Sequence, residues 1–219
     1  MSAPLNSLTT GSYSTLEWRQ TSAMGRDSEL AADDRVIGAL TFRSAWGTLA
    51  TATIGNDVGA FNNEGIGQRA YSDDADGVAS NTLNNASPIE ITANAEAFAD
   101  VGNANAFASI ETGIYHDAAA GQTANATLTN GPGSITIDAS ARAVARNPVT
   151  FDAGEAYAYA GIDTGIDQNA EATGTDDDSG RAVVAITNSG TVDIGADAAA
   201  TGDSRAIAYA FISTGIDQF

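Results

Sequence analysis

The residues of this 219-residue chain with the clearest chemical potential are aspartates that gather in short polar segments. One group lies in a turn, a second in the polar insertion 173–180, and a third flanks a turn predicted at Thr164–Gly165. Calcium binds about six to eight oxygen ligands, which clustered carboxylates and backbone carbonyls supply. The candidate calcium ligands are Asp73, Asp74, Asp76, Asp163, Asp167, Asp176, Asp177 and Asp178. No group matches an EF-hand loop, so the alternative for each is a solvated, charged turn.

Catalytic chemistry has little support in this sequence. The chain contains no Cys and no Lys, and His116 is its one histidine, at the position that Gln168 holds in a sister repeat. A Gly-x-Ser-x-Gly motif and a phosphate-binding loop are also missing. Arg142 and Arg146 lie near Asp138 and Asp152 in sequence, which leaves a polysaccharide-active β-helix enzyme as a remote alternative. We expect no enzymatic activity and, apart from calcium, no cofactor.

Aromatic residues recur at one position of a repeated motif and define a candidate stripe for binding or assembly. Alanines flank Phe107, Tyr159 and Tyr209, and a more divergent copy of the motif places Phe61 at the same position. If the alanines face inward the rings face outward, because neighbouring strand residues point to opposite sides. With two coils per repeat the rings would stand about 10 Å apart and suit stacking on sugars or on a neighbouring fibre. In the opposite interpretation, the aromatic residues form the core and the alanines lie outside.

These candidate sites belong to a sequence that repeats about every fifty residues, a period typical of stacked units that share one core. The segment Ala106–Ile114 returns as Ala158–Ile166 and again as Ala208–Ile216. Apolar residues alternate with polar residues within each unit, which predicts strands rather than helices. The predicted fold is all-β, a parallel β-helix (β-solenoid) whose repeats of about fifty residues each contain two coils of roughly 25 residues. A tandem of β-sandwich modules is the alternative.

A second repeated position holds asparagine, after an apolar residue and before a turn. Its copies are Asn85, Asn130 and Asn188. Side-chain amides at one offset in stacked coils form a ladder, in which each amide bonds to the next and to the turn backbone. We therefore interpret these asparagines as structural rather than ligand-binding residues.

The beginning and the end of the chain differ from the repeats between them. Residues 1–35 are polar and are interpreted as an N-terminal capping segment or flexible leader, before a solenoid at 36–219. The solenoid is divided into a divergent first coil 36–57, repeats 58–103, 104–155 and 156–205, and a partial repeat 206–219. Because an uncapped end coil exposes its core and its strand edges, we predict that Ile216 and Phe219 make an end-to-end contact.

The charge of the chain restricts its partners. Acidic residues number 28 against nine arginines, which gives a formal net charge of −19. Nucleic acids and anionic membrane surfaces are therefore repelled, while cations, neutral glycans and protein surfaces remain suitable. No segment has the length and apolar character needed for membrane insertion, and no signal peptide is visible in the first thirty residues.

The turn Asn188–Val192, with the alternating alanines after it, resembles repeats of bacterial filamentous-haemagglutinin and autotransporter-passenger proteins. The likeness is one of pattern and covers roughly residues 54–219. It implies a right-handed parallel β-helix outside the cell or on the surface of a bacterium, serving adhesion or surface assembly. No functional residues of the family carry over to this chain.

Two functions fit these observations. The first is an extracellular structural protein that self-assembles through β-solenoid stacking into fibres or a surface layer, so that its partner is another copy. The second is an adhesin or glycan-binding passenger fragment that binds glycans or a host or cell-surface protein. The incomplete last coil motivates the first hypothesis, and the aromatic stripe and acidic loops motivate the second.

Overall fold

The structure is a computed structural model that describes residues 28–30, 37–44, 49–54, 64–72, 77–99, 102–146, 154–174 and 179–219. Within these ranges the chain forms strands and no helix. The strands are β1 (Ser28–Leu30), β2 (Ile37–Ser44), β3 (Leu49–Ile54), β4 (Glu64–Tyr71), β5 (Val78–Asn85), β6 (Ile89–Ala99), β7 (Ala104–Ala120), β8 (Thr123–Asn130), β9 (Ser134–Ala145), β10 (Glu155–Ala172), β11 (Arg181–Asn188), β12 (Thr191–Gly202) and β13 (Arg205–Gln218). The prediction of an all-β fold is confirmed.

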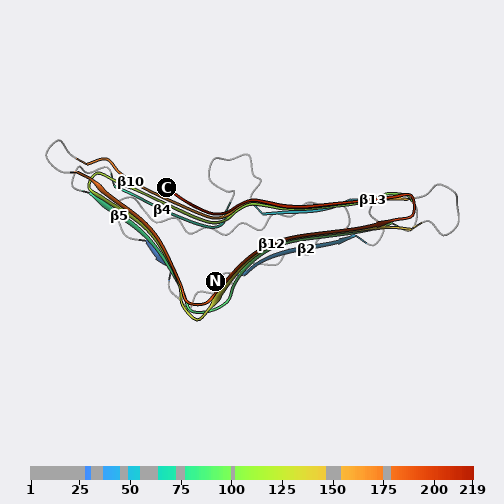
Figure 1. The fold of residues 1–219 in the computed structure, drawn as a ribbon, viewed down its shortest axis with the longest axis horizontal. Helices are drawn as coiled ribbons and strands as arrows, with labels where there is room; N and C mark the ends of the chain where they lie inside the picture. The colour runs from blue at the N-terminus through green and yellow to red at the C-terminus, as the bar shows by residue number, and fades with distance from the viewer. Residues whose placement is uncertain are drawn as a thin grey trace.

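Three stacked sheets of parallel strands make up the fold (Figure 1). Sheet A contains β1, β5, β8 and β11, and sheet B contains β2, β6, β9 and β12. Sheet C contains β3 and β4, which both pair with β7, followed by β10 and β13. The chain visits sheets A, B and C in turn and then begins again, so each strand pairs with its counterpart one circuit later. This arrangement is compatible with a parallel β-helix.

The pairing gives one circuit of the chain for each repeat. Asn85 bonds to Asn130, 45 residues later, and Asn130 bonds to Asn188, 58 residues later. In sheet C the side chains of Gln168 and Gln218, 50 residues apart, are hydrogen-bonded on neighbouring strands. A coil of roughly 25 residues would place bonded neighbours half as far apart in sequence. The prediction of two coils per repeat is therefore wrong.

The reason lies in the Thr-Gly motif of each repeat, which the sequence places in a turn. Thr164 and Gly165 instead lie inside β10, a strand of 18 residues whose register with β13 skips Asp163 and Gly165. Sheet C bends partway along its length and then continues (Figure 1). A Cβ atom on Gly165 would lie 2.5 Å from the carbonyl oxygen of Gly215 and 2.6 Å from Cδ1 of Ile194 in sheet B. The motif needs glycine because the backbone of the bend packs directly against the facing sheet.

The bend divides the cross-section into two arms (Figure 1). In the alanine arm, the first half of sheet C faces sheet B, and the core consists of small aliphatic side chains. Its fully buried alanines include Ala93, Ala95, Ala106, Ala108, Ala139, Ala158 and Ala160. In the polar arm, the second half of sheet C faces sheet A, and a second alanine cluster accompanies buried amides and an imidazole. Those polar residues are Gln68, Asn81, His116 and Gln168.

Strands begin before the predicted start of the solenoid. β1 lies within the segment 1–35 and pairs with residues Asn81–Leu83 of β5, so part of that segment belongs to sheet A. The predicted first coil, 36–57, contributes β2 to sheet B and β3 to sheet C. Residues 1–27 and 31–36 lie outside the described residues, and their interpretation as a cap or leader stays a prediction.

Candidate functional site

The outer side of sheet C carries a cluster of aromatic side chains, which we call the aromatic face. It comprises Phe107 of β7, Tyr157 and Tyr159 of β10, and Tyr209 and Phe211 of β13. Ring centroids lie 5.4 Å apart for Phe107 and Tyr157, and 5.9 Å apart for Tyr157 and Tyr209. Tyr159 and Phe211 meet edge to face at 5.3 Å. These separations are typical of interacting rings, so the five rings form one surface across three strands.

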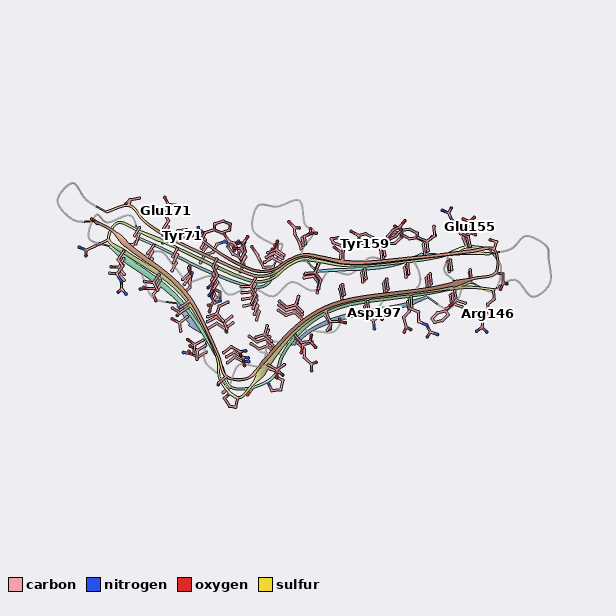
Figure 2. The ribbon with its side chains drawn as sticks, in the orientation of Figure 1. Tyr71, Arg146, Glu155, Tyr159, Glu171 and Asp197 are labelled. Atoms are coloured by element: carbon pink, nitrogen blue, oxygen red, sulfur yellow. The ribbon has the colours of Figure 1, made fainter. Side chains whose placement is uncertain are left out.

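The alternation assigns the two sides of sheet C correctly. Ala158 is fully buried, whereas its neighbour Tyr159 points outward (Figure 2) and Tyr209 is 55% exposed. Phe107, Tyr159 and Tyr209 are partners on adjacent strands. Adjacent strands lie about 4.8 Å apart, so the predicted spacing of about 10 Å is wrong for the same reason as the two-coil repeat.

The predicted stripe contains only part of the aromatic face. Tyr157 and Phe211 belong to it as well, because each lies two residues from a predicted member of the stripe on the same strand. That spacing is the signal that could have identified both residues from the sequence. Phe61 lies outside the described residues.

A groove of about 410 Å³ opens at one end of the aromatic face. Its lining consists of Asn103, Asn105 and Phe107, then Glu155, Ala156 and Tyr157, and finally Arg205 and Ile207. The backbone N–H of Glu155 donates a hydrogen bond of 3.0 Å to Asn103 Oδ1, which joins two of the three strands at the rim. Concave sites with aromatic walls and a few polar groups are typical of ligand binding. Sequence reasoning missed the groove because its residues come from three successive circuits.

The three repeated asparagines form a side-chain ladder at the corner between sheets A and B. Asn85 Nδ2 donates to Asn130 Oδ1, and Asn130 Nδ2 donates to Asn188 Oδ1, each at 2.7 Å. The same nitrogen atoms also donate to the backbone carbonyls of Ser134, at 3.2 Å, and Thr191, at 3.0 Å. Asn85 and Asn130 therefore each bind both the side chain and the corner backbone of the next circuit, which is a structural role rather than a ligand site.

A second polar ladder lies in the polar arm, where all its members but the exposed Gln218 of the last circuit are buried. Gln68, His116, Gln168 and Gln218 occupy one register position on successive strands of sheet C. Gln218 Nε2 donates to Gln168 Oε1 at 2.8 Å, and Gln168 Nε2 lies 3.3 Å from His116 Nδ1. Because the amide nitrogen of Gln168 faces Nδ1, that imidazole nitrogen accepts the hydrogen bond and Nε2 carries the proton.

The imidazole of His116 is fully buried and uncharged. Burial lowers the pKa of His116 from 6.5 to about 4, because a charged imidazolium would lose its hydration there. Within the described residues, His116 Nε2 and Gln68 Oε1 make no hydrogen bond to the protein. These two atoms are a donor and an acceptor on neighbouring strands. His116 therefore takes the place of a glutamine in the ladder, as the alignment of the repeats predicts.

The outer side of sheet C in the polar arm carries a further polar cluster. The hydroxyl of Tyr71 donates to one carboxylate oxygen of Asp117, and Asn169 Nδ2 donates to the other at 3.1 Å. The guanidinium of Arg69 lies 4.5 Å above the ring of Tyr115. Burial, together with the hydrogen bond to Asp117, raises the pKa of Tyr71, and burial with the charge of Asp117 raises that of Tyr115 to about 12. Both phenols are therefore neutral, and the cluster links strands rather than supplying a reactive group.

Of the predicted calcium ligands, the structure describes Asp163 and Asp167, which lie within β10 and do not flank a turn. Burial and then the neighbouring carboxylate of Asp217 raise the pKa of Asp167. In the described part of the chain no group of three His, Asp or Glu side chains is placed to hold a metal ion. Asp73, Asp74, Asp76, Asp176, Asp177 and Asp178 lie outside the described residues, and their assignment to calcium stays a prediction.

The last circuit has core residues on an open edge. Ile216 pairs with the fully buried Ile166 but is itself 48% exposed. Phe219 continues the pairing beyond β13, since its N–H donates to Gln168 and its carbonyl accepts from Ala170. Alternation from the inward-facing Gln218 places Phe219 on the outer side of sheet C. Of the two residues predicted for an end-to-end contact, Ile216 alone occupies a core position.

Within the described residues, no helix has the length and apolar character needed to cross a membrane. Comparison of the chain with models of protein families, with curated proteins and with solved structures gives no match in any of the three.

Proposed function

We propose that this chain is an extracellular structural β-solenoid, with one coil for each repeat of about fifty residues, that assembles end to end into fibres or a surface layer. The observation that carries the proposal is the equivalence of the last coil to the coils inside the stack. Strand β13 repeats the alternation of β10 in register, from Ala158↔Ala208 to Gln168↔Gln218. Its free edge therefore offers a further coil the same pattern of side chains and backbone groups that β10 offers to β13.

The exposed core of the last coil supports this proposal. Ile212 and Ile216 are 39% and 48% exposed, whereas their partners Ile162 and Ile166 are fully buried. In the described residues no strand pairs with the outer edges of β11, β12 and β13. An edge with unpaired backbone groups and exposed isoleucines favours the addition of another strand.

The opposite end of the stack supplies a matching edge. Among the described residues, β1, β2, β3 and β4 are the outermost strands there, and all run parallel to the strands they pair with. A contact between β11–β13 of one copy and β1–β4 of the next joins two different surfaces head to tail. Contacts of this kind do not close on themselves and generate filaments unless a rotation closes a ring.

The remaining parts of the proposal rest on the sequence. An extracellular or cell-surface location in a bacterium follows from the resemblance of the repeats, and the net charge of −19 opposes lateral aggregation of the filaments. Calcium bound by the acidic segments would reduce that repulsion. The proposal includes no catalytic activity.

The test is negative-stain electron microscopy and sedimentation of the purified chain across a concentration series, with calcium and with a chelator. We expect filaments that lengthen with protein concentration. The double variant Ile212→Asp, Ile216→Asp should form only short particles. Charges at these two exposed, inward-facing positions of β13 would be buried by a further coil, which prevents its addition. Ser213→Asp is the matched control, because it adds the same charge at an exposed residue between the two isoleucines, and it should assemble like the wild type.

Two results would overturn the proposal. One is a wild-type chain that stays monomeric at every concentration in both calcium and chelator. The other is a double variant that forms filaments as readily as Ser213→Asp. Filaments that disappear in chelator would keep the proposal and would add the acidic segments to the assembly mechanism.

A further inference from the structure

We propose that the groove at the end of the aromatic face binds a neutral oligosaccharide. This site lies on the outer side of sheet C, where β7, β10 and β13 run side by side, and so differs from the inward-facing isoleucines of β13 on which the proposed coil contact depends. Its volume of about 410 Å³ falls within the range of about 300–1,000 Å³ that is typical of small-molecule sites.

The aromatic wall of the groove suits the apolar side of a sugar. Phe107 and Tyr157 line it, with ring centroids 5.4 Å apart and planes inclined at 40°. Axial C–H bonds give a hexose an apolar side with partial positive charge, and this side stacks on the negative face of an aromatic ring. Two tilted rings from neighbouring strands form a shallow trough for one sugar ring.

Polar side chains on the rim suit the hydroxyl groups of the same ligand. Glu155 and Arg205 are partners on adjacent strands and are both exposed at the groove. A carboxylate accepts hydrogen bonds and a guanidinium donates them, so together they match neighbouring hydroxyl groups on a sugar. Glu155 points outward from sheet C, on the same side as Tyr159 (Figure 2).

The structure holds these groups in place before a ligand binds. Hydrogen-bonded strand pairing fixes Tyr157 between Asn105 and Ile207, and the bond from the Glu155 N–H to Asn103 Oδ1 fixes the rim. A preformed site loses little conformational entropy on binding, which favours a weakly interacting ligand such as a sugar.

The charge of the protein selects a neutral ligand over an acidic one. The net charge of −19 repels polyuronates, sulfated glycans and nucleic acids. Ring contacts also continue from Tyr157 to Tyr209, 5.9 Å away and 55% exposed, just beyond the groove. A longer oligosaccharide therefore contacts more aromatic surface and should bind more tightly than a monosaccharide.

The experiment measures retardation of the purified chain in native gels that contain soluble β-1,3-glucan, galactomannan or α-glucan, with the polyuronate alginate as the charged comparison. Titration calorimetry with oligosaccharides of the retarding glycan then compares affinity as the chain length increases. We expect at least one neutral glycan to bind, with Tyr157→Ala and Arg205→Ala each weakening affinity by about tenfold or more. Tyr115→Ala removes an aromatic residue from the other half of sheet C and should change affinity by less than about twofold.

Four results would overturn the proposal. These are no retardation by any neutral glycan, retardation by alginate alone, equal effects of Tyr157→Ala and Tyr115→Ala, and lateral dimers that Tyr157→Ala dissolves in the absence of glycan binding. The last result would assign the groove to a second copy of the chain.

Circular dichroism of each variant verifies that the fold is intact, and exposed Arg205 provides a variant without a core change. The double variant Ile212→Asp, Ile216→Asp changes no residue that lines the groove. Glycan binding by this variant therefore tests the groove separately from coil assembly.

Discussion

The two arms of the cross-section have the same strand alternation but different interiors. Among the described residues, the alanine arm is filled mainly by alanine and isoleucine side chains, with no buried amide or charged group. In the polar arm, buried alanines alternate with Gln68, His116, Gln168 and Asn81. One arm therefore depends on close packing alone, and the other adds a hydrogen-bonded ladder.

This difference indicates how a low-complexity repeat keeps its register. A column of alanines fits equally well after a shift of two residues along the strand, since such a shift preserves the buried face. Hydrogen-bonded amides lose their partners in the same shift, and each buried group left unsatisfied costs about 1–3 kcal/mol. We infer that the alanine arm provides the compact core and that the polar ladders fix the position of each coil on the next.

The largest effect should come from Gly165→Ala at the junction of the arms. The added Cβ would lie 2.5 Å from the Gly215 carbonyl oxygen and 2.6 Å from Ile194 Cδ1. One obstacle is a backbone atom of the neighbouring strand β13 and the other is a side chain of sheet B, so β10 must shift relative to both. We therefore expect a loss of about 3 kcal/mol or more in the free energy of unfolding. Chemical denaturation of this variant and of Gly215→Ala measures the effect. Gly215 has no atom within 4 Å of its would-be Cβ, so equal losses would refute close packing at the bend.

The next effect concerns the polar arm and depends on pH. Burial lowers the pKa of His116 from 6.5 to about 4, so the unfolded chain takes up the proton first when the solution is acidified. Stability from this residue is therefore complete above about pH 6.5 and is lost as the pH falls toward 4, by up to about 3 kcal/mol. His116→Gln places a third glutamine between Gln68 and Gln168 and should remove this dependence.

The measurement is the difference in unfolding free energy between the wild type and His116→Gln at pH 7.5 and at pH 4. Subtraction removes the contribution of the carboxylates, which titrate in both proteins. A difference that stays constant between the two pH values would mean that the imidazole is exposed to water or has a charged partner. It would also mean that the buried imidazole does not make the stability of the polar arm depend on pH.

The sequence allowed the faces of the strands to be predicted but not the path of the chain. Alternation identifies Ala158 as buried and Tyr159 as outward, and the recurrence of Asn130 identifies a ladder position. It cannot distinguish a bend from a reversal, because the side chains alternate in the same way through both. The alternation therefore predicts a turn where Gly165 lies at a bend, and a coil of half the observed length.

The groove and the buried ladder could not be predicted for a different reason. Tyr157, Glu155 and Arg205 come together only when the offset between circuits is known. The environment of His116 also depends on this offset. The alignment of the repeats shows that His116 and Gln168 occupy equivalent positions, but it does not show that His116 is buried or that the two side chains are hydrogen-bonded. Both features follow from the pairing register, which depends on packing across the whole stack.

A smaller effect is expected at the corner ladder, where the two arms meet. Asn130→Ala removes the donor and acceptor that join Asn85 to Asn188 and leaves the carbonyl of Thr191 without its bond. We expect a loss of about 2 kcal/mol in the free energy of unfolding. The neighbouring Thr129 is exposed on the same strand, and Thr129→Ala should cost less than about 0.5 kcal/mol. Similar values for the two variants would mean that the ladder adds nothing beyond surface contacts.

The smallest effect should come from like charges stacked outside the polar arm. Asp167 and Asp217 are register partners, and burial, followed by the charge of Asp217, raises the pKa of Asp167. A raised carboxyl pKa means that the folded state holds the proton more tightly than the unfolded state, so this residue destabilises the fold above its folded pKa and ceases to do so as the pH falls below its unfolded value. Asp167→Asn should therefore stabilise the fold at pH 7, by less than about 1 kcal/mol because water screens the pair. Thermal unfolding of Asp167→Asn, compared with that of Asp163→Asn, tests whether the substitution stabilises the fold. Asp163 is an exposed carboxylate on the same strand. If Asp167→Asn stabilises less than the control, or if its gain persists at pH 3, repulsion between successive coils does not limit stability. The polar arm would then owe its character to its buried ladder alone.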